Sequence, residues 1–176
     1  MKSRFFAGGC VLLAGACWFS LSADEPSASA TPYQAATNSR EARSRAMLLH
    51  ESVNGTLKIM HRDFVDADNA HAIPSASMED VFHELEKAYD VKMSWLTVNT
   101  DVVNFEHQAK TEFEKEAVNS LASGKPFVEQ LDKDRYRFAG AIRLGSQCLK
   151  CHLQLRSSNE DRTAGIVISM PIQAKP

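Results

Sequence analysis

The sequence predicts an α+β domain with a small antiparallel sheet, flanking helices and a long N-terminal helix. One observation behind this prediction is that apolar residues recur at helical spacing through residues 39–65. Another is that four short runs of β-favouring residues follow, at 91–98, 127–131, 136–144 and 164–170. With 176 residues, 44% of them hydrophobic, the chain is long enough for one domain with a real core.

The first expected element is an amphipathic helix from Ser39 to Val65, capped by Ser39 or Asn38. Its apolar residues recur every three or four positions: Ala46, Leu49, Val53, Leu57, Met60 and Phe64. His50 and His61 border the same side of this face, because their separation corresponds to about 20° around an ideal helix. The helix therefore presents two imidazoles beside its apolar face.

The next segment, residues 66–75, is acidic and irregular, and we expect a loop there. Ser77 then opens a second helix, Met78–Ala88, whose first turn carries two acidic residues. Residues 91–98 alternate in part and contain β-favouring residues, which predicts a strand.

Residues 102–107 have no clear period and predict a loop packed against the domain. Thr111 is placed to cap a helix at Glu112–Ala122, whose apolar residues repeat at helical spacing. Gly124 and Pro126 end that helix.

Residues 127–131 and 136–144 read as the two strands of a hairpin, joined by the charged turn 132–134. The segment Cys148–His152 is expected in the loop that follows. Residues 164–170 then form a compact apolar strand that completes the sheet.

The N-terminus has the pattern of a secretory leader, a short basic start followed by an apolar run that ends at Leu21. We expect residues 1–23 to be a signal peptide, which places the protein in the periplasm or otherwise outside the cytoplasm. A lipid anchor at Cys17 and an uncleaved leader that spans the membrane stay open as alternatives. The small, polar residues 24–38 predict a disordered linker, and 39–176 the domain.

Residues Cys148, Cys151 and His152 form a C-x-x-C-H motif, the attachment site of a c-type haem. Two thiols at this spacing can bond the two vinyl groups of one porphyrin, and His152 then lies beside the iron as its proximal ligand. The remaining two of the four cysteines, Cys10 and Cys17, lie in the leader. The motif predicts one covalent haem c. A structural zinc site, one alternative, lacks the second cysteine pair that it commonly requires. A redox C-x-x-C, the other, is expected near a βαβ pattern and at a helix start, neither of which the sequence shows.

The ligand on the opposite side of the iron is expected from the long helix. His61 is the first choice because it borders the apolar face, and a surface role is its alternative. Met60 and His50 are further candidates, although a methionine on such a face is more often core, and His50 can bond a haem propionate instead. His107 fits either a pocket or a solvated loop. The other two histidines of the domain are interpreted as surface residues: His71 and His83.

Arginines are the expected partners of the haem propionates, because a guanidinium group matches a carboxylate in shape and charge. The candidates, each of which also fits an ordinary surface charge, are Arg137, Arg143 and Arg162. The candidate aromatic walls of the haem pocket, each also consistent with general core, are Trp95, Phe105 and Phe138.

Several segments together resemble a family of periplasmic c-type haem domains with a PAS-like fold, once catalogued as a domain of unknown function. These segments are 60–64, 73–77, 104–107, 136–140, 148–152 and 160–165. The resemblance implies a sheet with flanking helices, one covalent haem and a sensor or redox role. Some relatives supply a thiolate to the haem from the N-terminal helix, but this chain has no cysteine there.

A formal charge of −2 and a pI near 6.3 argue against nucleic acid as a partner. The chain has no phosphate-binding loop, nucleophile elbow or H-E-x-x-H motif, which argues against a hydrolase. The leading hypothesis is an exported haem protein that senses redox state or a small ligand and signals through a periplasmic partner, after loading by the haem maturation machinery. An electron-transfer cytochrome is the alternative, ahead of a peroxidase-type enzyme, and a non-enzymatic role is favoured.

Overall fold

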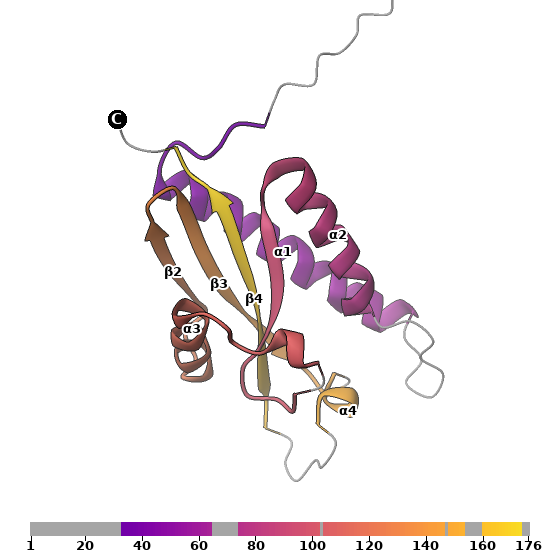
Figure 1. Cartoon of the computed structure of the whole chain (residues 1–176). Helices are drawn as coiled ribbons and strands as arrows, with labels where there is room; N and C mark the ends of the chain where they lie inside the picture. Colours follow the sequence, from indigo (N-terminus) through magenta and orange to yellow (C-terminus); the bar gives the residue numbers. More distant parts are fainter. Residues whose placement is uncertain (1–32, 65–73, 103, 147, 154–159, 174–176) are drawn as a thin grey trace, which may run out of the picture. The chain divides into compact units, whose positions relative to one another are not determined.

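The structure is a computed structural model that describes residues 33–64, 74–102, 104–146, 148–153 and 160–173 (Figure 1). The predicted leader, with Cys17, lies outside the described residues, as does most of the loop at 66–75 and His71. Among the described residues, no helix is both long enough and apolar enough to cross a membrane.

Four antiparallel strands form the sheet at the centre of the domain (Figure 1). They are β1 (Lys92–Thr97), β2 (Phe127–Asp132), β3 (Arg135–Leu144) and β4 (Arg162–Pro171). Their order is β1-β4-β3-β2, so the last strand of the chain lies between β1 and the β2–β3 hairpin. The predicted α+β class is confirmed, as are the hairpin and the strand after the second helix. The finer PAS-like description stays a prediction.

Helices cover both faces of the sheet. The helices α1 (Ser39–Phe64) and α2 (Pro74–Tyr89) share one hydrophobic core with the buried side chains of β3 and β4. The helix α3 (Glu112–Ala122) packs a smaller core against the opposite face, around Ala139 and Val167. Because neighbouring residues of a strand point to opposite faces, each position on β3 and β4 belongs to one of these two sides.

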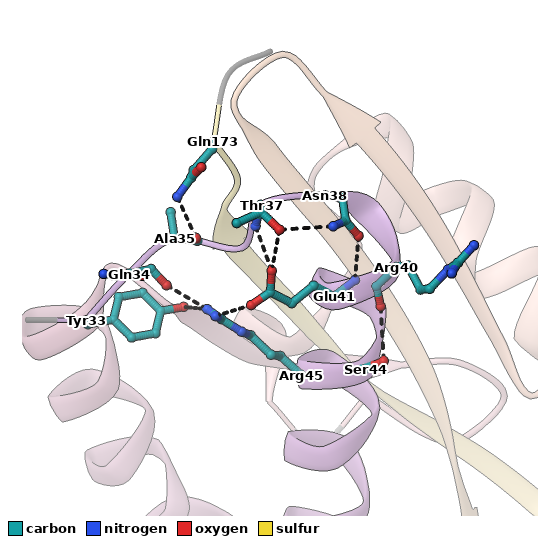
Figure 2. Close-up of polar contacts among 10 residues, drawn as sticks. All are labelled: Tyr33, Gln34, Ala35, Thr37, Asn38, Arg40, Glu41, Ser44, Arg45 and Gln173. Atoms are coloured by element: carbon teal, nitrogen blue, oxygen red, sulfur yellow. Dashed lines mark hydrogen bonds and ion pairs between the residues drawn. The ribbon is translucent and has the colours of Figure 1, made fainter. Parts of the chain in front are cut away.

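The start of α1 is stabilised by a dense set of polar contacts (Figure 2). The side chain of Asn38 accepts the backbone N–H of Glu41 at 3.0 Å, so Asn38 is the cap. The Glu41 carboxylate in turn accepts the backbone N–H of Thr37 at 2.9 Å and its hydroxyl at 2.7 Å. The hydrogen bonds from Thr37 lower the pKa of Glu41, followed by the charge of Arg45.

The segment before α1 is part of the domain, which differs from the linker expected to run through residue 38. Ala36 is fully buried and forms a parallel bridge with Ile172, and its carbonyl accepts the backbone N–H of Gln173 at 2.8 Å. The compact unit accordingly begins at Tyr33. The small side chain of Ala36 permits this close approach, which composition alone does not reveal.

The course of α1 along β3 determines where its second histidine lies. Near its start, Arg43 bonds Glu129 on β2, and further on the His50 ring bonds Ala141 near the end of β3. His61 is about 16 Å beyond His50 along the helix axis. It is therefore well separated from the contact between His50 and Ala141.

Three local predictions require correction. The helix α2 begins at Pro74 rather than after Ser77, because proline suits the first helical position, where its missing N–H needs no partner. The expected loop at 102–107 contains a 3₁₀ turn, η1 (Phe105–His107), and Phe105 is 75% exposed, so it is not a core residue. The C-x-x-C-H segment, expected in a loop, forms the short helix α4 (Leu149–His152).

Candidate functional site

The C-x-x-C-H motif is held on one helical turn at the end of the sheet. The carbonyl of Gly145, the residue after β3, accepts the backbone N–H of Cys148 at 2.9 Å and that of Leu149 at 3.3 Å. Leu149 is buried in the same core as α1, which anchors the turn to the domain. Cys148 is half-buried and packs against that core, whereas the side chain of Cys151 lies outside the described part.

His152 ends this turn and is partly buried. Its backbone N–H bonds the carbonyl of Cys148 at 3.1 Å, and its carbonyl accepts the N–H of Asp101 at 3.2 Å. Burial lowers the pKa of the imidazole, and the nearby charges of His61 and His107 lower it further. The neutral imidazole is thus favoured, and that is the form that binds a metal ion.

His61 comes from the end of α1 and lies close enough to His152 to act on it electrostatically. Its Nδ1 donates to the carbonyl of Leu57, one helical turn back, at 2.9 Å. A hydrogen bond of this kind fixes the tautomer and leaves the lone pair on Nε2. The structure therefore brings together a half-buried imidazole from each of two segments that are far apart in the sequence.

His50 has a different environment. It is 7% exposed and lies over the sheet, where its Nε2 is 3.1 Å from the carbonyl oxygen of Ala141 and its Nδ1 is 3.2 Å from a Glu51 oxygen. The ring also meets Phe138 edge-on, with 5.9 Å between ring centroids. Since both nitrogens have protein partners, His50 is a packing residue of α1. Met60 is half-buried beside His61, and no contact distinguishes it as a ligand.

His107, left open by the sequence, is placed near His152 by the turn η1. Its Nε2 is 2.8 Å from a carboxylate oxygen of Glu79 on α2. His83, on α2, is exposed as expected. Trp95 and Phe138 are buried in the core, and the indole N–H of Trp95 donates to Ser75 at 3.0 Å.

Two of the three candidate arginines for the haem propionates, Arg137 and Arg143, lie on the α3 face of the sheet. Arg137 is on the α3 face, where it lines a pocket with Glu112 and Glu116 and pairs with Asp132 at 3.1 Å. The side chain of Arg143 is 83% exposed, and it lies on the same face of β3 as Arg137 because the two are an even number of positions apart. Alternation of side-chain direction along a strand shows which arginines share a face of the sheet. It does not show which face lies beside the C-x-x-C-H turn.

Two buried polar atoms have no hydrogen-bond partner in the described part of the chain: Oδ1 of Asn54 and Nε of Arg162. Asn54 lies on α1 between His50 and His61, and Arg162 begins β4 opposite Leu144. Buried polar groups are normally satisfied, so unpaired atoms here fit a site completed by a polar group from outside the chain. No three described His, Cys, Asp or Glu side chains gather to hold a bare metal ion.

Comparisons with known proteins agree on one relationship. A sequence model of the family described as Tll0287-like matches residues 34–170. The solved structure described as the crystal structure of the cyanobacterial heme-protein Tll0287 is similar in fold, with a TM-score of 0.58 and 12% sequence identity. The match covers 80% of this chain and 100% of that chain. None of the curated proteins matches the sequence.

Proposed function

This chain belongs to the Tll0287-like family, and on that premise we propose that it binds one haem, attached covalently at the C-x-x-C-H motif of α4. The observation that carries the proposal is the C-x-x-C-H motif, which is held on one turn anchored by Gly145 and Leu149 and which ends in a half-buried His152. A pair of cysteines at this spacing followed by a histidine is the attachment site of a haem c. The haem protein named in the structural match supports the same choice of cofactor.

The residues of the motif have distinct roles in this proposal. Cys148 and Cys151 would hold the haem through two thioether bonds, each formed by addition of the thiol S–H across one vinyl group. His152 would supply an iron ligand from the same turn. The anchored turn of α4, with Leu149 buried below it, holds these three positions on the domain.

His61 is the residue of α1 that would supply a second iron ligand. Its Nδ1–H bond to Leu57 orients the ring and leaves Nε2 as the donor atom, which is the usual arrangement of a metal-binding histidine. His50 is unsuited because its Nε2 bonds Ala141. The absence of a cysteine from residues 39–64 removes a thiolate ligand from that helix.

We propose a redox-sensing or small-ligand-sensing role. The bound haem supplies one-electron redox chemistry and a place for small ligands. His61 lies in the last turn of α1, and helix ends open at low free-energy cost, so this residue would be able to move without unfolding of the domain. The leader sequence favours the periplasm and a separate partner protein that receives the signal.

An electron-transfer cytochrome is the second candidate. It would be favoured if His61 and His152 both stayed bound to the iron in both oxidation states. Spectra of the reduced protein with and without carbon monoxide separate the two roles. Displacement of His61 by carbon monoxide supports sensing, whereas sharp six-coordinate bands that carbon monoxide does not alter support electron transfer.

The cofactor proposal is tested by producing the full chain with a c-type maturation system and measuring the mass of the denatured protein. We expect one haem per chain in the wild type and none when both cysteines of the motif are changed to serine. His61→Ala should change the ferrous spectrum, and the matched change of the exposed His83→Ala should not. A wild-type chain without covalent haem would refute the proposed function.

A further inference from the structure

We infer that Arg162 binds a propionate of the haem; this inference rests on the function proposed above and assigns a role to the first residue of β4. Its position in the sheet is the first step. Ile166 and Ile168 lie in the core shared with α1. Positions two apart on a strand point to the same face, so the parity of β4 assigns Arg162 to that face.

The register brings Arg162 next to the attachment site. Arg162 pairs with Leu144, which is buried in the α1 core, and the following residue, Gly145, accepts the backbone N–H of Cys148 at 2.9 Å. Only three residues therefore separate the partner of Arg162 from the haem-attaching Cys148.

The guanidinium group of Arg162 contains a buried atom that could accommodate a further hydrogen-bond partner. Its Nε is buried, and in the described part of the chain it has no hydrogen-bond partner. The residue as a whole is half-buried, but a buried N–H group without a partner costs free energy, and an arginine stays charged at every physiological pH. The neighbouring carboxylate, Asp161, is exposed and lies 4.0 Å from Arg143 instead.

A carboxylate is the group that best completes this site, because it accepts two parallel hydrogen bonds from a guanidinium group. A haem attached at Cys148 carries two carboxylates as its propionates, so it brings the required group to the same end of the sheet. Arg137 pairs with Asp132 on the α3 face, and Arg143 is exposed on that face, so neither duplicates the position of Arg162.

The experiment compares two matched substitutions in the haem-loaded full chain, Arg162→Gln and Arg143→Gln. Both remove one positive charge from residues in adjacent register pairs, but they lie on opposite faces of the sheet. A nearby cation disfavours the more positive ferric haem. Loss of Arg162 should therefore lower the midpoint reduction potential at neutral pH, by clearly more than loss of Arg143 does.

A second pair, Arg162→Lys and Arg143→Lys, keeps the charge and serves if Arg162→Gln does not load haem. The propionate bending band in the resonance Raman spectrum should shift in the first variant and stay unchanged in the second. Equal potential shifts in the two glutamine variants, or an unshifted Raman band in Arg162→Lys, would overturn the role of Arg162 alone. A wild-type chain without covalent haem would overturn the proposed function, and this inference with it.

Discussion

Gly140 is the position at which a single methyl group should move α1 off the sheet. A Cβ atom built there would lie 2.3 Å from Cδ2 of His50, 2.6 Å from its Nε2 and 2.8 Å from Cε1 of Phe138. The His50 ring cannot withdraw easily, because it is 7% exposed and bonds the carbonyl of Ala141 at 3.1 Å. We therefore predict that Gly140→Ala destabilises the domain.

The magnitude follows from three contributions. Overpacking a core by one methyl group costs about 1–3 kcal/mol, and loss of the His50–Ala141 hydrogen bond costs about 1 kcal/mol. Alanine is favoured over glycine in a strand by about 0.5–1 kcal/mol, which offsets part of this. The free energy of unfolding should fall by about 2 kcal/mol.

The assay is denaturant unfolding of Gly140→Ala, of His50→Ala and of the double variant. In the His50→Ala background the added methyl group enters vacated space, so Gly140→Ala should cost at least about 1 kcal/mol less there. The matched control is Gly55→Ala, in the middle of α1, where nothing lies within 4 Å of the added Cβ; it should raise stability by about 0.5–1 kcal/mol. Additive effects of the two changes at 50 and 140 would refute the proposed contact.

Three further predictions concern stability. Asn54→Leu removes a buried amide oxygen that has no partner in the described structure and should raise the unfolding free energy of the haem-free chain by about 1 kcal/mol; a loss of stability in denaturant unfolding would contradict this. Thr111→Ala deletes the cap that accepts the Glu114 backbone N–H at 3.2 Å and should cost about 1 kcal/mol, measured in the same way, and no loss would contradict the capping box. The pKa of Glu129 is lowered in the folded state, chiefly by its hydrogen bond from Arg43. The carboxylate therefore contributes to the free energy of unfolding above pH 4.5, and this contribution is lost as the pH falls through the lowered pKa. Glu129→Gln should therefore lose less stability than the wild type on acidification below 4.5, and parallel pH profiles would refute this.

Features set by a few neighbouring residues could be predicted from the sequence. The bounds of α3 are confirmed to the residue, because the capping box of Thr111 and Glu114 spans a single helical turn. The β2–β3 hairpin is also confirmed, and its turn contains Lys133 with a φ of 47°. The family resemblance is confirmed by the match to the Tll0287-like family.

Contacts between residues far apart in the sequence could not be predicted from local sequence patterns. Ala36 reads as linker by composition, yet it is fully buried against Ile172 at the far end of the chain. Arg137 and Arg162 are equivalent as isolated arginines, and only the pairing of β3 with β4 shows that they face opposite sides of the sheet. The same holds for His50 and His61, which share a helix face but differ in what lies beneath them.

The sequence by itself determined the α+β class, the four strands, the three longer helices and the C-x-x-C-H motif, because each is encoded in residue types at short, regular spacings. Tertiary structure decided which histidine of α1 lies near His152. His50 packs on the sheet against Ala141, whereas His61, about three helical turns further along α1, is the histidine of that helix whose charge acts on His152. Helix periodicity gives the direction of each side chain around the helix axis. Which part of the domain lies opposite that side chain is decided only when the chain folds.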